Sequence, residues 1–150
     1  MVADRIEQEI VIEAPPEVVW ELVTDPEHVG AWFGDEAEID LRRGGDAAIT
    51  WERYGRFLAR VEKVEPPRFF SFRWSRPKET PVAEGNSTLV EFSLSAEGEG
   101  TRLTVVESGF AALATPEDEK EQHVADNTEG WSIELGHLRE YAAKVHSRAR

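Results

Sequence analysis

The sequence predicts an α+β fold in which a curved antiparallel sheet wraps a long C-terminal helix that carries Trp131, with an apolar cavity between sheet and helix. Two patterns support this fold class. Apolar and polar residues alternate through seven short segments, which is typical of strands with one buried face. From about Asn127 the apolar residues recur every three or four positions instead, which is typical of an amphipathic helix. Because a sheet with one apolar face must be covered, this long helix is expected to cover it.

A first strand and two short helices are expected before the main sheet. Residues 5–13 alternate as a strand, and Pro16 suits the first turn of a helix over residues 17–23. Asp25 is expected to cap a second helix that ends near Gly30, since an aspartate followed by proline is a common helix start.

Six further strands follow, and short turns join them. The alternating segments cover residues 36–41, 47–52, 56–62, 68–75, 88–95 and 102–107. Turn residues such as Gly44 and Gly45 separate them. Consecutive strands joined by short turns form an antiparallel meander.

The C-terminal region is expected to be helical. A helix start is predicted at Thr115–Asp118, and a longer helix from about Asn127, with Asn127 or Thr128 as its cap. The longer helix has one apolar stripe, formed by Trp131, Leu135, Leu138, Ala142 and Val145.

Composition narrows the classes of function. The 150 residues are expected to form one domain over residues 1–150. The 17 basic and 30 acidic residues give a net charge of −13, which disfavours nucleic acid and anionic membranes as partners. The chain has no cysteine, which excludes thiol catalysis and thiolate metal sites. Its first residues do not resemble a signal peptide and no segment is apolar enough to span a membrane, so the cytoplasm is the expected compartment.

Three stretches resemble a known family. Residues 10–20 (IVIEAPPEVVW) resemble its first strand running into an APPEVVW segment, and residues 26–33 (PEHVGAWF) resemble its segment that begins with proline and ends in Trp-Phe. Residues 101–110 (TRLTVVESGF) resemble its last strand, and Gly130-Trp131 the glycine and tryptophan that open its final helix. In this order they resemble the START-like superfamily, also called SRPBCC, with the helix-grip fold. The most similar branch is that of the activator of the heat-shock-protein ATPase, which has a stress-response role.

The resemblance implies a seven-stranded antiparallel sheet gripping the last helix, with a pocket between them. The ligand expected there is an apolar or aromatic small molecule, because the inner face of the predicted sheet is rich in large rings. No cofactor is implied, and the protein is expected to be a monomer or homodimer. The candidate ligand-binding residues are Trp32, Trp51, Phe57, Phe72, Trp74, Phe92, Glu107, Trp131 and Leu135. Any single ring is better explained as ordinary core filling, whereas the set as a whole favours a partly open cavity at one end of the helix.

Glu107 is the polar residue that stands out in this set. By alternation it shares a face with Leu103 and Val105, so its carboxyl group can point inward and act as a ligand anchor or a general acid or base. Alternatively the strand ends there, and the side chain reaches solvent or an arginine such as Arg56 or Arg73.

Three functions therefore remain open. The first is a binding domain for an apolar small molecule, and the second is a co-chaperone-like module that binds a protein partner through its acidic surface. The third is a cyclase or hydrolase that uses Glu107, although the catalytic residues are unknown because no second catalytic group is evident. The four histidines lack the spacing of a metal site, so no metal ligand is predicted.

Overall fold

A computed structural model describes residues 3–148, and side chains are described through residue 145. Along the chain the elements are β1 (Arg5–Ile12), α1 (Pro16–Thr24), α2 (Pro26–Trp32), β2 (Glu36–Ile39), β3 (Asp46–Trp51), β4 (Gly55–Glu65), β5 (Phe69–Ser75), β6 (Ser87–Glu97), β7 (Gly100–Ser108), a 3₁₀ turn η1 (Phe110–Ala112) and α3 (Glu117–Arg148). This order confirms the predicted α+β fold, with a seven-stranded antiparallel sheet around a long C-terminal helix.

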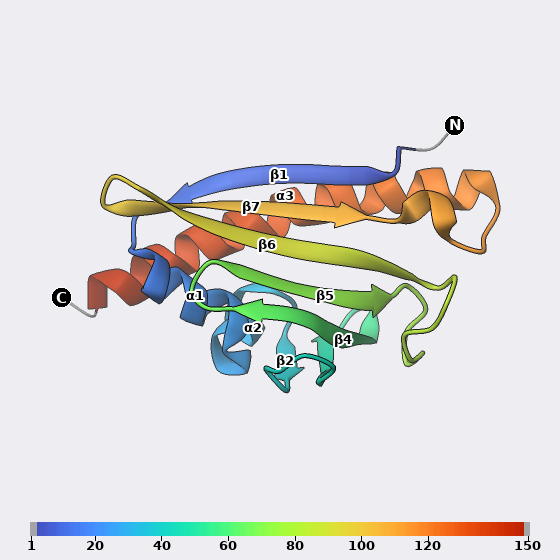
Figure 1. The fold of residues 1–150 in the computed structure, drawn as a ribbon, viewed down its shortest axis with the longest axis horizontal. Coiled ribbons are helices and arrows are strands. Elements are labelled where there is room, and N and C mark those ends of the chain that lie inside the picture. Colours follow the sequence, from blue (N-terminus) through green and yellow to red (C-terminus); the bar gives the residue numbers. More distant parts are fainter. Residues whose placement is uncertain (1–2, 149–150) are drawn as a thin grey trace.

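The sheet is a meander of β2 to β7, and the first strand, β1, is added at its β7 edge. Its spatial order is β1-β7-β6-β5-β4-β3-β2, and every neighbouring pair is antiparallel. β1 therefore joins the far end of the meander and pairs with β7, with Arg5 opposite Ser108 and Ile12 opposite Thr101. Figure 1 shows α3 running behind β1, β7 and β6 and ending beside α1 and α2. Helices and sheet enclose one apolar core.

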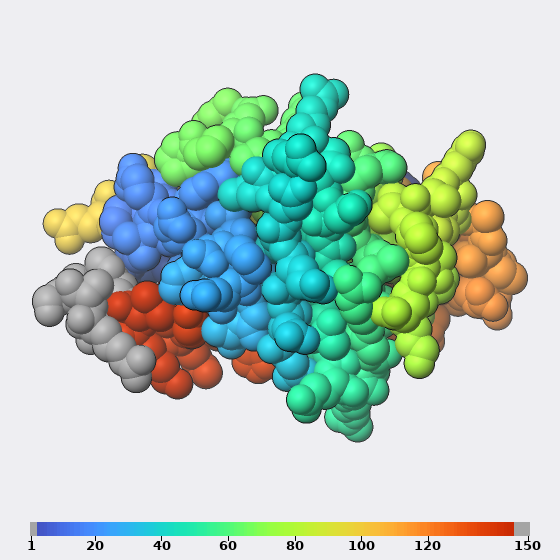
Figure 2. Space-filling model, turned by 90° about the horizontal axis from the view of Figure 1, so that it is seen from below, coloured from blue at the N-terminus to red at the C-terminus, as the bar shows by residue number. Residues whose placement is uncertain are grey.

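The short helices pack together in a defined way. The Asp25 carboxylate accepts a hydrogen bond from Glu27 N at 3.0 Å, which confirms the predicted cap of α2. α2 extends to Trp32, two residues beyond the predicted end near Gly30, and its last turn is closed by the Phe33 N–H, which donates to the Val29 carbonyl oxygen at 2.8 Å. The indole Nε1 of Trp32 donates to the Leu22 carbonyl oxygen of α1 at 2.7 Å and joins the two helices. α1 and α2 form much of the face seen in Figure 2, with the C-terminal part of α3 next to them.

The helix start predicted at Thr115–Asp118 is confirmed, but the separate start predicted at about Asn127 was wrong. α3 is one helix from Glu117, so Asn127 and Thr128 lie inside it instead of capping it. Three acidic residues fill the first turn and favour a helix N-terminus, since its exposed N–H groups attract negative charge. The early turns are mostly polar, which hid the helical period from the sequence pattern. Among residues 3–148, no helix is both long and apolar enough to cross a membrane.

Candidate functional site

Aromatic rings fill the space between the sheet and α3. Trp131 is 3% exposed, and its ring stacks on that of Phe33, with 5.2 Å between centroids and 19° between planes. On the sheet side the same indole contacts Trp74 at 6.1 Å and meets Phe92 edge-on at 5.9 Å. Such offset and edge-to-face pairs are favourable beyond the area they bury. The concave face opposite Trp131 is therefore packed.

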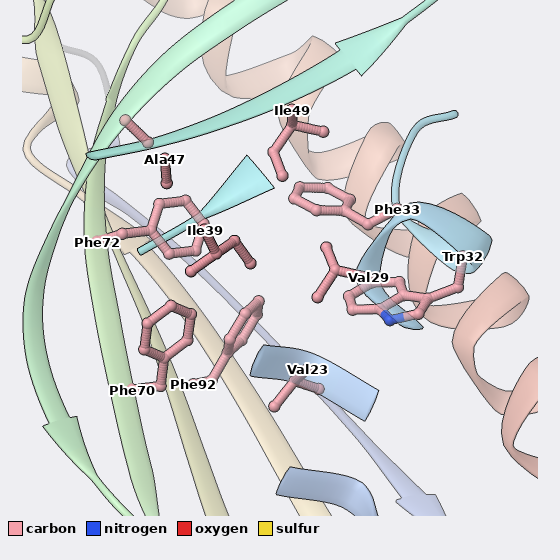
Figure 3. A pocket seen from close by; sticks show the side chains of 11 residues that line it. Val23, Val29, Trp32, Phe33, Ile39, Ala47, Ile49, Phe70, Phe72 and Phe92 are labelled. Atoms are coloured by element: carbon pink, nitrogen blue, oxygen red, sulfur yellow. The ribbon is translucent and has the colours of Figure 1, made fainter. Parts of the chain in front are cut away.

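A small apolar cavity lies to one side of this cluster. Its volume is about 20 Å³, roughly what one water molecule needs. Figure 3 shows Phe70, Phe72 and Phe92 of the sheet on one side and residues of α2 on the other. The lining residues are Val23, Val29, Trp32, Phe33, Ile39, Ala47, Ile49, Ala59, Phe70, Phe72 and Phe92. None belongs to α3, so this cavity lies between the sheet and the α1–α2 pair, whereas the sequence suggested a cavity against the C-terminal helix.

Glu107 lies inside the molecule, at the end of β7. It is 0% exposed, and its carboxylate accepts hydrogen bonds from four side chains, so it reaches neither solvent nor an arginine. The donors to Oε2 are Trp74 Nε1 at 2.9 Å and the Thr88 hydroxyl at 2.5 Å. Trp131 Nε1 donates to Oε1 at 2.9 Å, and the Asn127 amide lies 3.0 and 3.1 Å from the two oxygens.

This carboxylate joins three strands and the helix. Its partners come from β5, β6 and α3, and each is electrically neutral. Because the side chain is 0% exposed and both oxygens accept from protein donors, a substrate cannot reach the carboxylate in this conformation. Arg56 and Arg73, the alternative partners considered from the sequence, bind Glu38 and Glu79, and Glu62, respectively.

A second acidic side chain, Glu134 of α3, contacts the segment between α2 and β2. Its Oε2 accepts from the backbone N–H of Gly34 at 3.0 Å, and its Oε1 lies 3.3 Å from Nδ1 of His137. Burial raises the pKa of the Glu134 carboxyl group, and the Gly34 hydrogen bond and His137 oppose that rise. About two turns further along α3 from Glu134, the Tyr141 hydroxyl and His28 Nδ1 share a hydrogen bond of 2.6 Å, so α3 holds α2 near both of its ends.

His123 occupies an apolar position near the start of α3. It is 5% exposed and packs edge-on against Phe110, with 4.9 Å between ring centroids. Its Nδ1 is buried without a hydrogen-bond partner. Burial and then the positive charge of Arg76 lower its pKa to about 4, while Asp126 opposes them. The imidazole is therefore neutral at physiological pH.

The predicted ligand-binding residues fall into separate groups. Trp32, Phe72 and Phe92 line the cavity. Trp74, Glu107 and Trp131 form the buried hydrogen-bond cluster. Trp51 and Phe57 contact one another, with 5.7 Å between ring centroids, and Leu135 is buried on α3 at 2% exposure.

The sequence reading missed several members of both groups. Phe33 and Val29 of the cavity wall were not selected, although Phe33 follows directly after the chosen Trp32. Thr88 and Asn127 were also missed, since neither has a pattern that points to Glu107. Among the side chains described up to residue 145, no three histidine or acidic groups come together in a way that could hold a metal ion.

Comparisons with known proteins agree with this geometry. A family model described as Activator of Hsp90 ATPase homolog 1-like protein matches residues 13–143. CalU16 of Micromonospora echinospora is 30% identical with a TM-score of 0.70, over 96% of this chain and 79% of that one. The Aha1 dimer of Colwellia psychrerythraea is 18% identical with a TM-score of 0.73, over 93% of this chain and 95% of that one. At this identity the likeness shows a shared fold only.

A longer protein also matches. DynU16, described as a putative protein in the dynemicin biosynthetic locus, is 30% identical with a TM-score of 0.74. The match covers 93% of this chain but 47% of DynU16, so this chain spans about half of that protein's length. A search of curated proteins finds no match.

Proposed function

Because the chain belongs to the Activator of Hsp90 ATPase homolog 1-like family, within the START-like superfamily, we propose that it acts as one START-like domain that binds an apolar or aromatic small molecule. The observation that supports this proposal is the cavity between the sheet and the α1–α2 pair, whose eleven lining side chains are all apolar. A site without polar groups selects a ligand by shape and by exclusion of water, so the ligand class is neutral and hydrophobic.

The volume sets a condition on this function. A cavity of about 20 Å³ holds no aromatic molecule, whereas a cavity of ~150 Å³ with apolar walls binds benzene. Binding therefore requires the wall to move and enlarge the space. The energy of burying the ligand's apolar surface has to exceed the cost of that movement.

A fluorescent probe tests this proposal directly. N-phenyl-1-naphthylamine is neutral, apolar and brighter in an apolar site, and we expect saturable binding to the purified protein. Ala47→Val adds two methyl groups to the cavity wall on β3, so it should weaken binding by about fivefold or more. Ala96→Val makes the same change at an exposed position of β6 and serves as the control. Equal affinities for the two variants would place the probe elsewhere and remove the support for this site.

Native mass spectrometry of the protein from its own cells gives a second measurement. The proposal expects a bound neutral compound that Ala47→Val reduces and Ala96→Val leaves in place. This experiment also tells a monomer from a homodimer, both of which the sequence left open.

Family membership favours a second candidate, a co-chaperone-like module with a protein partner. The family is described by its likeness to an activator of the Hsp90 ATPase. If this chain shares that activity, adding it should raise the steady-state ATPase rate of an Hsp90 protein from the same cell. An unchanged rate at saturating concentration argues against this candidate, and the cytoplasmic location that such a partner requires stays a prediction.

A further inference from the structure

The cavity wall has one part that is neither helix nor strand. Of the eleven lining residues, ten belong to α1, α2 or the sheet, and Phe33 alone lies in the segment between α2 and β2. Strand residues are fixed by the hydrogen bonds of the sheet, and the residues of α1 and α2 by their helices. Phe33 is the C-cap of α2, with its N–H bound to the Val29 carbonyl oxygen at 2.8 Å, but the backbone that follows it belongs to neither element. Among the lining residues, Phe33 can therefore move with the least disruption of helices and strands, and its movement would release space for a ligand.

The Phe33 ring fills space that a ligand needs. It is 3% exposed and lies between the cavity and Trp131, with 5.2 Å between the two ring centroids. The same ring stacks on Trp32 at 5.2 Å and meets Trp51 edge-on at 5.2 Å. Figure 3 shows the ring beside Ile49 and above Val29, at the boundary of the cavity. Moving this ring outward would join its volume to the cavity, and the flat faces of the surrounding indoles would then contact the ligand.

Three hydrogen bonds fix the backbone next to Phe33. Asp35 is bound to β3 and to the residue that follows it, because its N–H donates to the Thr50 carbonyl at 2.8 Å and its carboxylate accepts from Glu52 N at 2.7 Å. Gly34 is tied to α3, because its N–H donates to the Glu134 carboxylate at 3.0 Å. Asp35 thus anchors the segment to the sheet, while Glu134 fixes it at the residue directly after Phe33.

We propose that Phe33 is a movable lid on the apolar cavity and that Glu134 is the latch that holds this lid closed. This inference rests on the proposed binding of an apolar small molecule. When the Glu134–Gly34 hydrogen bond opens, the backbone after Phe33 turns and the ring leaves the cavity, while Asp35 remains attached to β3. The ligand occupies the space, and its presence keeps the latch open.

The glycine between lid and anchor fits this arrangement. Gly34 has φ of +74°, and a Cβ atom there would lie 2.9 Å from the Thr50 carbonyl oxygen. Only glycine takes this conformation and this close approach to β3 without strain. The backbone therefore holds the Gly34 amide in position to donate. Whether the hydrogen bond forms then depends on its acceptor, the Glu134 carboxylate.

Probe binding to latch variants tests the inference. Glu134→Ala removes the acceptor, so we expect the apparent affinity for N-phenyl-1-naphthylamine to rise about five- to tenfold. Glu134→Gln keeps an oxygen that can accept from Gly34 and should stay within about twofold of the wild type. Glu140→Ala removes the same charge from an exposed position of α3 and is the matched control. Equal affinities for Glu134→Ala and Glu140→Ala would overturn the latch.

Phe33→Ala separates failure of the latch from failure of the proposed function. It deletes the lid and opens the space permanently, so it should bind the probe at least as tightly as Glu134→Ala. If neither Phe33→Ala nor the wild type binds, there is no apolar site and the proposed function fails. If both bind and Glu134→Ala matches the wild type, the site is real and the latch alone is refuted.

Hydrogen exchange provides a measurement on the unaltered protein, independent of whether the variants fold. Because the latch opens when ligand enters, saturating probe should speed exchange of the Gly34 amide, while the Asp35 amide, bonded to Thr50, keeps its rate. A Gly34 amide that exchanges at the same rate or more slowly with bound probe would refute the opening of the latch.

Discussion

Replacing Glu107 with glutamine tests the buried cluster with the smallest change in shape. Each carboxylate oxygen accepts one indole N–H, Trp74 at Oε2 and Trp131 at Oε1. A glutamine side chain has one oxygen and one NH₂ group, so in either orientation the NH₂ group faces an indole N–H. One buried indole donor then loses its acceptor, whichever way the amide turns.

The magnitude follows from the number of donors affected. An unsatisfied buried donor costs about 1–3 kcal/mol, and the remaining hydrogen bonds weaken when their acceptor loses its charge. Relief from burying a charge offsets part of this loss. We expect Glu107→Gln to lower the free energy of unfolding by about 3 kcal/mol. Glu107→Ala leaves every donor of the cluster without its acceptor and should cost about 4–5 kcal/mol.

Urea unfolding followed by tryptophan fluorescence measures both variants, because Trp74 and Trp131 are part of the cluster. Glu99→Gln, in the exposed turn between β6 and β7, makes the same chemical change and should shift stability by less than about 0.5 kcal/mol. A loss below about 1 kcal/mol for Glu107→Gln would show that the carboxylate does not hold sheet and helix together as the hydrogen bonds imply.

Three further predictions address other parts of the core. The folded state keeps His123 neutral with a pKa near 4, and the unfolded chain protonates it near 6.5, so its contribution to stability is complete above pH 6.5 and falls as the pH drops towards 4. Urea titrations should show wild type losing roughly 2 kcal/mol more than His123→Leu between pH 7 and 4.5. In the same assay Gly34→Ala should lower the free energy of unfolding by about 2–3 kcal/mol, because the new Cβ meets a backbone oxygen. Gly98→Ala is the control, since Gly98 also has a positive φ but open space around it, and it should lower the free energy by about 1 kcal/mol. Equal losses for the two variants would contradict this prediction. Trp32→Phe removes the hydrogen bond to Leu22 and should lower thermal stability by about 1–2 kcal/mol in calorimetry, and no change would show that the bond is not needed.

Period-two alternation was enough to predict the strands, and it also put Glu107 on the inner face of β7. Its partners were beyond the reach of the sequence, because they come from two other strands and the helix. Asn127 shows the reason most clearly. Asparagine is a common helix cap, so a start there was the natural inference, yet the helix continues through it and its amide binds Glu107.

The position of the cavity was equally hidden. The sequence correctly selected Trp32, Phe72 and Phe92 as large inward-facing rings, but it could not tell which rings touch. The stacking of Phe33 on Trp131 fills the space next to α3, so the cavity lies elsewhere, against α1 and α2. That contact joins residues far apart in the chain, and no local pattern reports such a pairing.

The pairing of the first strand with the last one determines when this protein can fold during synthesis. β1 leaves the ribosome first, but its partner β7 is made only after the other strands, since Ile12 pairs with Thr101. Until β7 has been made, the apolar residues of β1 have no strand to pair with. Bringing β1 and β7 together then closes a loop that contains all the other strands, which is slow. Glu7 and Glu9 lie on the opposite side of this waiting strand and oppose its association with other nascent chains. Completion of the sheet is therefore a late event, and truncated chains that end before β7 should depend on chaperones to stay in solution.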